Sequence, residues 1–312
     1  MTLFIIFLVI LTACLFSYTR WRAAAIETAF PPQGRIIDVD GVKVHVLEAG
    51  PKDAPAVVLV HGASGNALDQ MLGLGQVLAQ TRRVIAFDRP GLGYSERPDR
   101  AGISTPTGQA RLFASAMAAI GLEKALVVGH SWGGAMALAM ALDFPGRVSG
   151  LVLLAPVSHP WPGGITWYYR LAGLPVVGRA FCSLFVMPVG ENVVDGSAAG
   201  AFKPEPPPAD YTRRIAAKLL LRPKSFRANG RDMCDLKASV AAQAERYGEI
   251  GMPTLIMTGD RDGSVSPDIH SRALARQIGG ARLIMLAGAG HMPHWTARER
   301  IAAEIADMFP SV

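Results

Sequence analysis

Cysteine is scarce in this chain of 312 residues, which has only Cys14, Cys182 and Cys234. An odd number, with one cysteine inside an N-terminal apolar run, gives no basis for a disulfide framework. The fold must therefore be stable by packing alone. Charge is also sparse, because 18% of the residues are charged and 50% are hydrophobic. This length and composition suit one sizeable core with an insertion better than two full domains.

Several patterns of other protein classes are missing. No run of Lys and Arg is interleaved with aromatic residues, so we expect no nucleic-acid partner despite the net charge of +6. The sequence has no internal repeat. The glycine-rich turn at 129–134 does not have the GxGxxG pattern of nucleotide-binding folds. We expect neither a cofactor nor a metal site.

The N-terminus carries a long uncharged segment, Leu3–Tyr18 (LFIIFLVILTACLFSY). It is slightly shorter than the roughly 17–25 residues of a typical spanning helix. Trp21 follows between Arg20 and Arg22, where an interfacial anchor would lie. A basic protein beside such a segment is attracted to an anionic leaflet. We therefore expect residues 1–25 to be a single-helix membrane anchor.

Two other fates of this segment remain open. Ala23–Ala25 has the small residues of a secretory cleavage site, and Leu11–Cys14 resembles the cleavage box of a bacterial lipoprotein. Either would place the protein outside the cytoplasm, secreted or periplasmic. The arginines after the apolar run instead favour the cytoplasmic face.

Beyond the anchor, short apolar runs alternate with segments of helical periodicity. Asp40-Gly41 predicts a hairpin between the first two strands. The predicted strands are Arg35–Asp40, Val42–Glu48, Ala56–Val60, Arg83–Phe87, Ala125–Val128, Leu151–Ala155, Thr254–Met257 and Arg282–Leu286. The predicted helices between them are Leu68–Gln80, Thr107–Ile120, Gly133–Asp143, Ile269–Ile278 and Ala297–Met308. This order predicts an α/β fold with a doubly wound, mostly parallel sheet.

The alternation stops for about 100 residues after Leu151–Ala155. We interpret residues 161–247 as a helical cap inserted late in the sheet order. Residues 33–160 and 248–312 would then form the core. Seven basic residues lie within 213–231 without an acidic one, which is typical either of a solvated helix face or of a surface for anionic lipid.

Ser131 is the predicted nucleophile. The sequence Gly129-His130-Ser131-Trp132-Gly133 follows an apolar strand and begins a helix. Such a turn is so sharp that the residues two before and two after the serine must lack side chains, and it lifts the hydroxyl above the sheet edge.

A serine needs a base and an orienting acid, and both follow later strands. His291 follows the strand at Arg282–Leu286, and Asp262 follows the strand at Thr254–Met257, with Asp260 as the alternative acid. The order serine, acid, histidine is the one that this sheet topology requires.

Backbone N–H groups are expected to stabilise the oxyanion. Trp132 at the helix N-terminus is one predicted donor. The second is Ala63 in the loop HGASGN, with Ser64 as the alternative. His61, His130 and His294 are expected to be structural or packing residues.

The motifs HGASGN, DRPGLGYSERP, GHSWGG, GDRDGSVSP and GAGHMPHW together resemble the capped α/β-hydrolase superfamily over about residues 35–310. The resemblance implies an α/β-hydrolase fold and a Ser131, Asp262, His291 triad. It does not specify the substrate, because the superfamily includes esterases, lipases, C–C bond hydrolases and perhydrolases. Dehalogenases and epoxide hydrolases use an aspartate where this chain has Ser131, which argues against both.

The cap is expected to line the substrate pocket. Its aromatic residues Trp161 and Trp167, with Ser64 and His159, form the predicted substrate-binding set. Together with the anchor, they favour a small-molecule ester with a hydrophobic acyl group. Hydrolysis of such an ester through an acyl-enzyme is the leading function. The alternatives are C–C bond hydrolysis or perhydrolysis on the same triad, or slow ligand sensing. The sequence does not indicate an oligomeric state.

Overall fold

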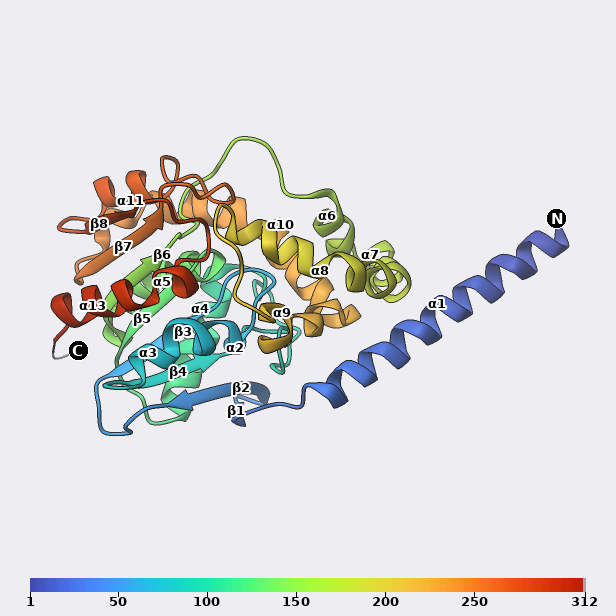
Figure 1. The fold of residues 1–312 in the computed structure, drawn as a ribbon, viewed down its shortest axis with the longest axis horizontal. Helices are drawn as coiled ribbons and strands as arrows, with labels where there is room; N and C mark the ends of the chain where they lie inside the picture. The colour runs from blue at the N-terminus through green and yellow to red at the C-terminus, as the bar shows by residue number, and fades with distance from the viewer. Residues whose placement is uncertain (311–312) are drawn as a thin grey trace.

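The computed structural model describes residues 1–310, and its centre is one eight-stranded sheet with the order β1-β2-β4-β3-β5-β6-β7-β8 (Figure 1). Strand β2 is antiparallel to β1 and β4, whereas all the other neighbouring strands are parallel. The strands are β1 Arg35–Val39, β2 Val42–Ala49, β3 Ala56–Val60, β4 Arg83–Phe87, β5 Ala125–His130, β6 Val148–Leu154, β7 Thr254–Gly259 and β8 Arg282–Leu286. The predicted α/β fold with a mostly parallel sheet is confirmed.

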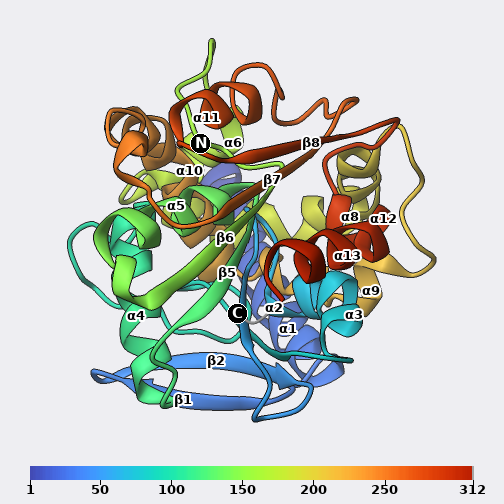
Figure 2. The same cartoon turned by 90° about the vertical axis from the view of Figure 1, so that its left-hand side faces the viewer.

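Helices cover both faces of this sheet, as Figure 2 shows. In β3, Val58 packs into the core on the α4 and α5 side, and Leu59 packs into the core on the α3 and α13 side. Both side chains are fully buried, which explains why the inner strands are continuous apolar runs. The helices around the sheet are α2 Ala67–Gln70, α3 Gln76–Leu78, α4 Pro106–Ala119, α5 Trp132–Asp143, α11 Ser271–Gln277, α12 Pro293–Thr296 and α13 Arg298–Met308.

Two elements differ from the sequence prediction. The predicted helix Leu68–Gln80 is interrupted by a π-helical segment at Met71–Gly75. A Cβ atom on Gly73 would lie 2.7 Å from the backbone oxygen of His294, so the backbone of α12 approaches too closely for a side chain there. Strand β6 begins at Val148, earlier than predicted, because Gly150 interrupts the apolar run while accommodating the ring of Phe309.

The segment between β6 and β7 forms helices over the loops that follow the strands (Figure 1). Tyr169 and Asn229 of this segment contact Ser64, which follows β3, and Tyr211 contacts Asp69 of α2. The helices are α6 Trp167–Gly173, α7 Val177–Phe181, α8 Met187–Phe202, α9 Tyr211–Arg214 and α10 Pro223–Ala244. A π-helical turn joins α7 to α8, and a 3-10 helix, Ala217–Leu221, follows α9. We refer to residues 161–247 as the cap, with the predicted bounds.

The N-terminal segment is one helix, α1 Thr2–Ala29, which is longer than the predicted 1–25. Its first half projects away from the body of the molecule (Figure 1). Its second half packs on the cap, where Ile26 is 3% exposed. The helix is long and apolar enough to cross a membrane.

A buried ion pair joins the cap to the sheet. The Arg89 and Asp232 side chains are both fully buried, and an Arg89 Nη1 lies 3.3 Å from an Asp232 carboxylate oxygen. The Arg89 guanidinium also lies 3.8 Å from the centre of the Trp132 ring, a cation–π contact. Arg97 provides a second positive charge for Asp232 at 2.9 Å. Helix α10 is therefore joined to the first residue of α5, directly after Ser131.

We expect Asp232→Ala to lower the free energy of unfolding by about 3–5 kcal/mol, because it leaves the Arg89 charge buried without its counterion. Thermal and denaturant unfolding of the detergent-solubilised full chain measure this change. Asp268→Ala is the matched control, because it breaks an exposed pair with Arg272 at 2.9 Å and should cost less than about 1 kcal/mol. Equal losses in the two variants would contradict the structural role of Asp232.

Candidate active site

Ser131 occupies a strained turn between β5 and α5. Its φ of 54° and ψ of −119° are rare for a residue with a side chain. The turn is possible because its neighbours are glycines. A Cβ atom on Gly129 would lie 2.4 Å from the Gly133 oxygen, and one on Gly133 would lie 2.4 Å from the Val60 oxygen. The backbone of Ser131 is fixed on both sides, since its N–H donates to the Leu154 oxygen at 3.0 Å and its oxygen accepts from the Val157 N–H at 3.1 Å.

Three side chains meet in one hydrogen-bonded line at this turn. His291 Nε2 lies 3.0 Å from Ser131 Oγ, and His291 Nδ1 lies 2.7 Å from Asp262 Oδ2. Each of the three residues is 8% exposed. A carboxylate on Nδ1 favours the tautomer in which Nε2 is free to accept the serine proton.

The two candidate acids have different partners. Asp262 Oδ1 accepts hydrogen bonds from the backbone N–H groups of Ser264 at 2.8 Å and Val265 at 2.9 Å, which leaves Oδ2 facing His291. Asp260 instead accepts a hydrogen bond from the Gly288 N–H at 2.7 Å. The structure thus places Asp262 against the imidazole and uses Asp260 to fix the loop after β8.

The oxyanion loop lies directly beside the serine. A Cβ atom on Gly62 would lie 3.1 Å from the Ser131 Cβ, so this backbone passes next to the nucleophile. The Ser64 N–H already donates to Asn229 Oδ1 at 2.8 Å, which makes Ser64 a poor oxyanion donor. Trp132 is the first residue of α5, where backbone N–H groups lack intrahelical acceptors. This geometry is compatible with Ala63 and Trp132 as the two donors.

Sequence reasoning missed two cap residues that contact this loop. Tyr169 Oη lies 2.9 Å from Ser64 Oγ, and Asn229 Nδ2 donates to the same hydroxyl at 3.1 Å. Asn229 is fully buried. Burial raises the pKa of Tyr169 to about 12, because it outweighs the hydrogen bond with Ser64, which lowers this pKa. The only signal in the sequence is a polar Asn-Gly pair inside a predicted helical region.

The predicted substrate-binding residues do not form one group. Ser64 lies at the site, but its hydroxyl is already paired with the cap. His159 Nε2 lies 2.9 Å from Gln277 Oε1, facing α11. Trp161 is half-buried and lies near the His270 ring. Trp167 is 66% exposed on the outside of the cap, so its assignment as a pocket-lining residue is not supported.

His61 holds the oxyanion loop from inside the protein. Its Nε2 accepts a hydrogen bond from the Arg89 N–H at 2.9 Å, and its Nδ1 lies 2.9 Å from the Gly62 oxygen. Burial, with the nearby Arg89 charge, lowers the pKa of His61 to about 4. A neutral imidazole is therefore part of the native structure.

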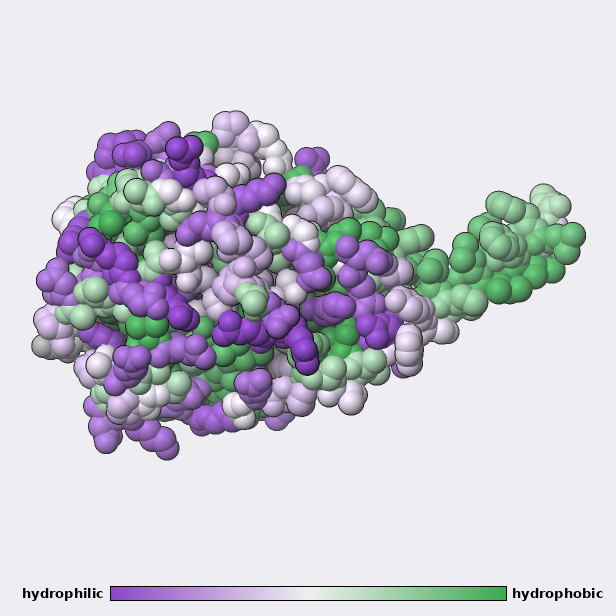
Figure 3. All heavy atoms as spheres, in the orientation of Figure 1, coloured by the Kyte–Doolittle hydropathy of each residue, from purple (hydrophilic) through white to green (hydrophobic). Residues whose placement is uncertain are grey.

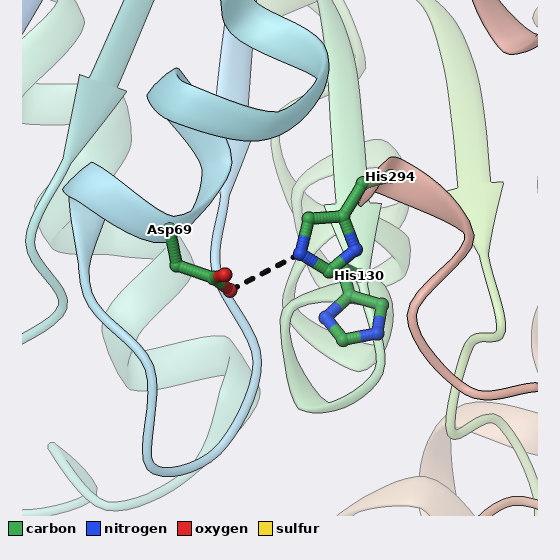
Figure 4. A group of neighbouring side chains, drawn as sticks. All are labelled: Asp69, His130 and His294. Carbon is green, nitrogen blue, oxygen red and sulfur yellow. Dashed lines mark hydrogen bonds and ion pairs between the residues drawn. The ribbon is translucent and has the colours of Figure 1, made fainter. Parts of the chain in front are cut away.

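A second buried group lies behind the triad. His130 Nε2 lies 2.8 Å from the His291 backbone oxygen, and its ring packs 4.3 Å from the His294 ring. His294 Nε2 lies 3.1 Å from Asp69, as Figure 4 shows. Burial alone would raise the pKa of Asp69, but the facing His294 holds it well below its usual range.

Asp69, His130 and His294 are of metal-binding type, and one potential ligand atom from each lies within 4.8 Å of the others. The Asp69 carboxylate is nevertheless already occupied, because it accepts hydrogen bonds from Tyr211 Oη and Trp295 Nε1, each at 2.8 Å. The three residues are therefore part of a hydrogen-bonded network that joins the cap to the loop of His291. The expected lack of a metal site remains a prediction.

We expect His61 to make the fold acid-sensitive. The pKa of His61 is near 6.5 in the unfolded chain and about 4 in the folded protein. Its stabilising contribution is full above pH 6.5 and is lost as the pH falls toward 4. That loss is on the order of 3 kcal/mol at most. His61→Gln keeps an acceptor for Arg89 without titrating there, so its melting temperature should fall less between pH 6.5 and 4. An unchanged acid slope in this variant would contradict the assignment.

The chain is similar to known hydrolases in sequence and in structure. Residues 55–297 match the protein family described as alpha/beta hydrolase fold. The 2-hydroxymuconate semialdehyde hydrolase of Pseudomonas putida is 38% identical over 136 residues, or 42% of this chain and 46% of that protein. The chain thus spans less than half of that relative's length.

Two further similarities extend over most of the chain. The 2-hydroxy-6-oxo-6-phenylhexa-2,4-dienoate hydrolase of Comamonas testosteroni is 27% identical over 272 residues, which are 83% of this chain and 88% of that protein. The solved structure of a membrane phospholipase A, a bacterial virulence factor, has a TM-score of 0.70 at 21% identity and covers 99% of both chains. That structure shares the fold. The family match over residues 55–297 establishes that this chain belongs to the α/β-hydrolase fold family.

Proposed function

We propose that this hydrolase is a membrane-anchored serine esterase that cleaves hydrophobic carboxylic esters through an acyl-enzyme. The observation that carries the proposal is the hydrogen-bonded line from Ser131 through His291 to Asp262. A serine at the strained turn, a base within 3.0 Å and an oriented acid are the requirements of nucleophilic acyl transfer.

The residues have distinct roles in the proposed reaction. Ser131 Oγ attacks the ester carbonyl while its proton passes to His291 Nε2. The N–H groups of Ala63 and Trp132 stabilise the resulting oxyanion. The intermediate collapses, the C–O bond breaks, and His291 returns the proton to the leaving alcohol. Water activated by His291 then hydrolyses the acyl-Ser131 ester and restores the free serine.

Hydrolysis of a C–C bond is the second candidate function. It is supported by the names of two relatives, the 38% identical 2-hydroxymuconate semialdehyde hydrolase and the hydrolase of Comamonas testosteroni. The same triad geometry serves both reactions, since fold and triad do not determine the substrate. The long apolar helix α1 favours an ester with a hydrophobic acyl group over a soluble ring-cleavage product.

Packing of α1 on the cap supports a retained anchor over a cleaved secretory signal. Arg22 Nε donates to Glu191 at 3.0 Å, and Arg222 pairs with Glu27 at 2.9 Å. Cleavage after Ala23–Ala25 would separate Arg22 from Glu191 and expose the apolar surface around Ile26. Lipoprotein processing at Cys14 would leave these contacts intact.

We expect the detergent-solubilised full chain to react with a fluorophosphonate probe and to hydrolyse p-nitrophenyl esters, with an optimum at medium or long acyl chains. Ser131→Ala should lose labelling and turnover. Ser149→Ala is the matched control, because Ser149 lies on β6 near its start, away from the site, and should behave like the wild type. Turnover of a β-diketone-like or ring-cleavage substrate with no turnover of simple esters would support the second candidate instead.

Asp262→Asn should lower kcat by about 10⁴ with an intact fold, because an amide no longer favours the productive His291 tautomer. Asp260→Asn tests the alternative acid. That variant should keep kcat within about ten-fold, because Asp260 contacts the Gly288 N–H rather than His291. Steady-state kinetics and melting temperatures of both variants are the measurements. A reversed order of the two effects would assign the acid to Asp260.

A further inference from the structure

The cap exposes an apolar face. Outside Met1 and α1, the described residues include eight exposed large hydrophobic side chains, and seven of these lie within α6–α8 and their connections. These seven, which we call the cap face, are Trp167, Leu174, Val176, Val177, Phe185, Val189 and Val193. The eighth is Ile36 on β1. Single exposed apolar residues need no explanation, whereas a concentration on one element indicates a contact surface.

The cap face and α1 lie at the same end of the molecule. Figure 1 shows α6, α7 and α8 at the end from which α1 projects, and Figure 3 shows apolar atoms gathered there beside the helix. Contacts fix the direction of α1 relative to the cap. Tyr18 Oη donates to Glu191 at 2.9 Å, Arg22 forms an ion pair with the same carboxylate, and Ile26 is buried against Val186 and Met187.

The free part of α1 is shorter than a bilayer is thick. Residues Thr2–Cys14 are all exposed, whereas the helix begins to contact the cap at Leu15 and buries Thr19. At 1.5 Å per residue this free part is about 20 Å long, compared with a hydrocarbon core of about 30 Å. The remaining 10 Å or so must come from the docked part of α1. Any membrane that α1 crosses therefore reaches the cap helices packed beside it.

Charged residues are few along the cap face and more frequent beside the docked part of α1. Between 167 and 193 the charged residues are Arg170, Arg179 and Glu191, and Glu191 is paired with Arg22. No unpaired acidic group opposes an anionic leaflet in this stretch. Farther along α1, a cavity of about 570 Å³ is bordered by the basic residues Arg22, Arg213 and Lys218 and by the acidic residues Asp195 and Asp210. Charged side chains at that level suit the polar headgroup layer and not the hydrocarbon core.

We propose that the cap face is immersed in the leaflet that holds α1, so that lipid, and not another protein, covers it. The proposal rests on the membrane-anchor part of the proposed function and goes beyond it, because it assigns a second membrane-binding surface. An apolar face with flanking basic residues buries about 5–10 Å into an interface, which matches the length that α1 lacks. A hydrophobic ester dissolved in the leaflet would then reach the cap without crossing water.

A fluorescent probe on the cap face tests this contact. Val176→Cys and, as the matched control, Ile36→Cys are made in a Cys14→Ala, Cys234→Ser background and labelled with an NBD group. Both positions are apolar and exposed, at 78% and 49%. The full chain is reconstituted in phosphatidylcholine–phosphatidylglycerol vesicles. We expect several-fold brighter, blue-shifted emission at position 176, with quenching by doxyl groups on the lipid acyl chains, and neither effect at position 36.

The outcomes separate the two proposals. Flotation of the protein with the vesicles, combined with water-like emission at position 176, would overturn the cap contact and leave the anchor intact. Failure to float would overturn the anchor itself. Emission that is bright but insensitive to doxyl lipids, with energy transfer between labelled copies, would assign the face to a second copy of the chain and overturn the proposal.

Activity provides an independent readout. Val176→Asp with Val177→Asp should lower turnover of a long-chain ester embedded in vesicles by about ten-fold or more, because charge opposes immersion. Turnover of a soluble short-chain ester should stay unchanged, since both residues lie on the outer surface. Ile36→Asp should alter neither rate. Equal rates on vesicle substrate in all three proteins would contradict the role of the cap face.

Discussion

The backbone of Ser131 is the constraint on which the site depends. A φ of 54° is unfavourable for a serine, so the surrounding structure must hold it in place. Gly129 and Gly133 let α5 approach β5 and β3 within distances that no side chain permits. Hydrogen bonds from the Ser131 N–H to Leu154 and from the Val157 N–H to the Ser131 oxygen join the turn to β6. The position of the Ser131 hydroxyl is thus set by packing that involves three strands.

The sheet order brings the other two residues to that turn. Strands β5, β6, β7 and β8 are neighbours and parallel, so the loops after them meet at one edge. Asp262 follows β7 and His291 follows β8, and the two strands pair directly. The His291 loop is held from behind by His130, which lies beside Ser131 in sequence. One residue of the Ser131 turn therefore also positions the loop that carries His291.

Local patterns were sufficient to predict the strands. Ala56–Val60 and Arg83–Phe87 have the predicted bounds, because a strand buried on both faces needs an uninterrupted apolar run. The half-buried edge strand Arg282–Leu286 also has its predicted bounds. The positions of Ser131, Asp262 and His291 after strands likewise depend on sequence-local turns.

Features created by contacts between distant segments could not be predicted in this way. The π-helical turn at Met71–Gly75 lies where α12 approaches Gly73 too closely for a side chain. Asn229 became part of the site through a contact with Ser64, 165 residues away. The aromatic character of Trp167 suggested a pocket, but whether a cap residue faces inward depends on how α6 packs, and α6 turns Trp167 outward. The cap face could likewise be recognised only from the structure, because it consists of side chains that the cap helices turn outward.

In the proposed membrane arrangement, Glu191 explains why the cap would lie along the membrane instead of crossing it. Over an 18-residue window, the mean hydropathy is 1.2 in the helical stretch Val177–Phe202 and 2.3 in α1, and the stretch contains Glu191 and Asp195. A carboxylate inside hydrocarbon is costly unless it is paired. Glu191 is paired with Arg22 of α1, and this partner lies beyond the uncharged run Leu3–Tyr18. In that arrangement the ion pair belongs at the headgroup level, and it would set the depth at which the rest of the stretch can meet the acyl chains. In the proposed arrangement, helix α1 alone crosses the bilayer, and the cap face meets one leaflet from the side.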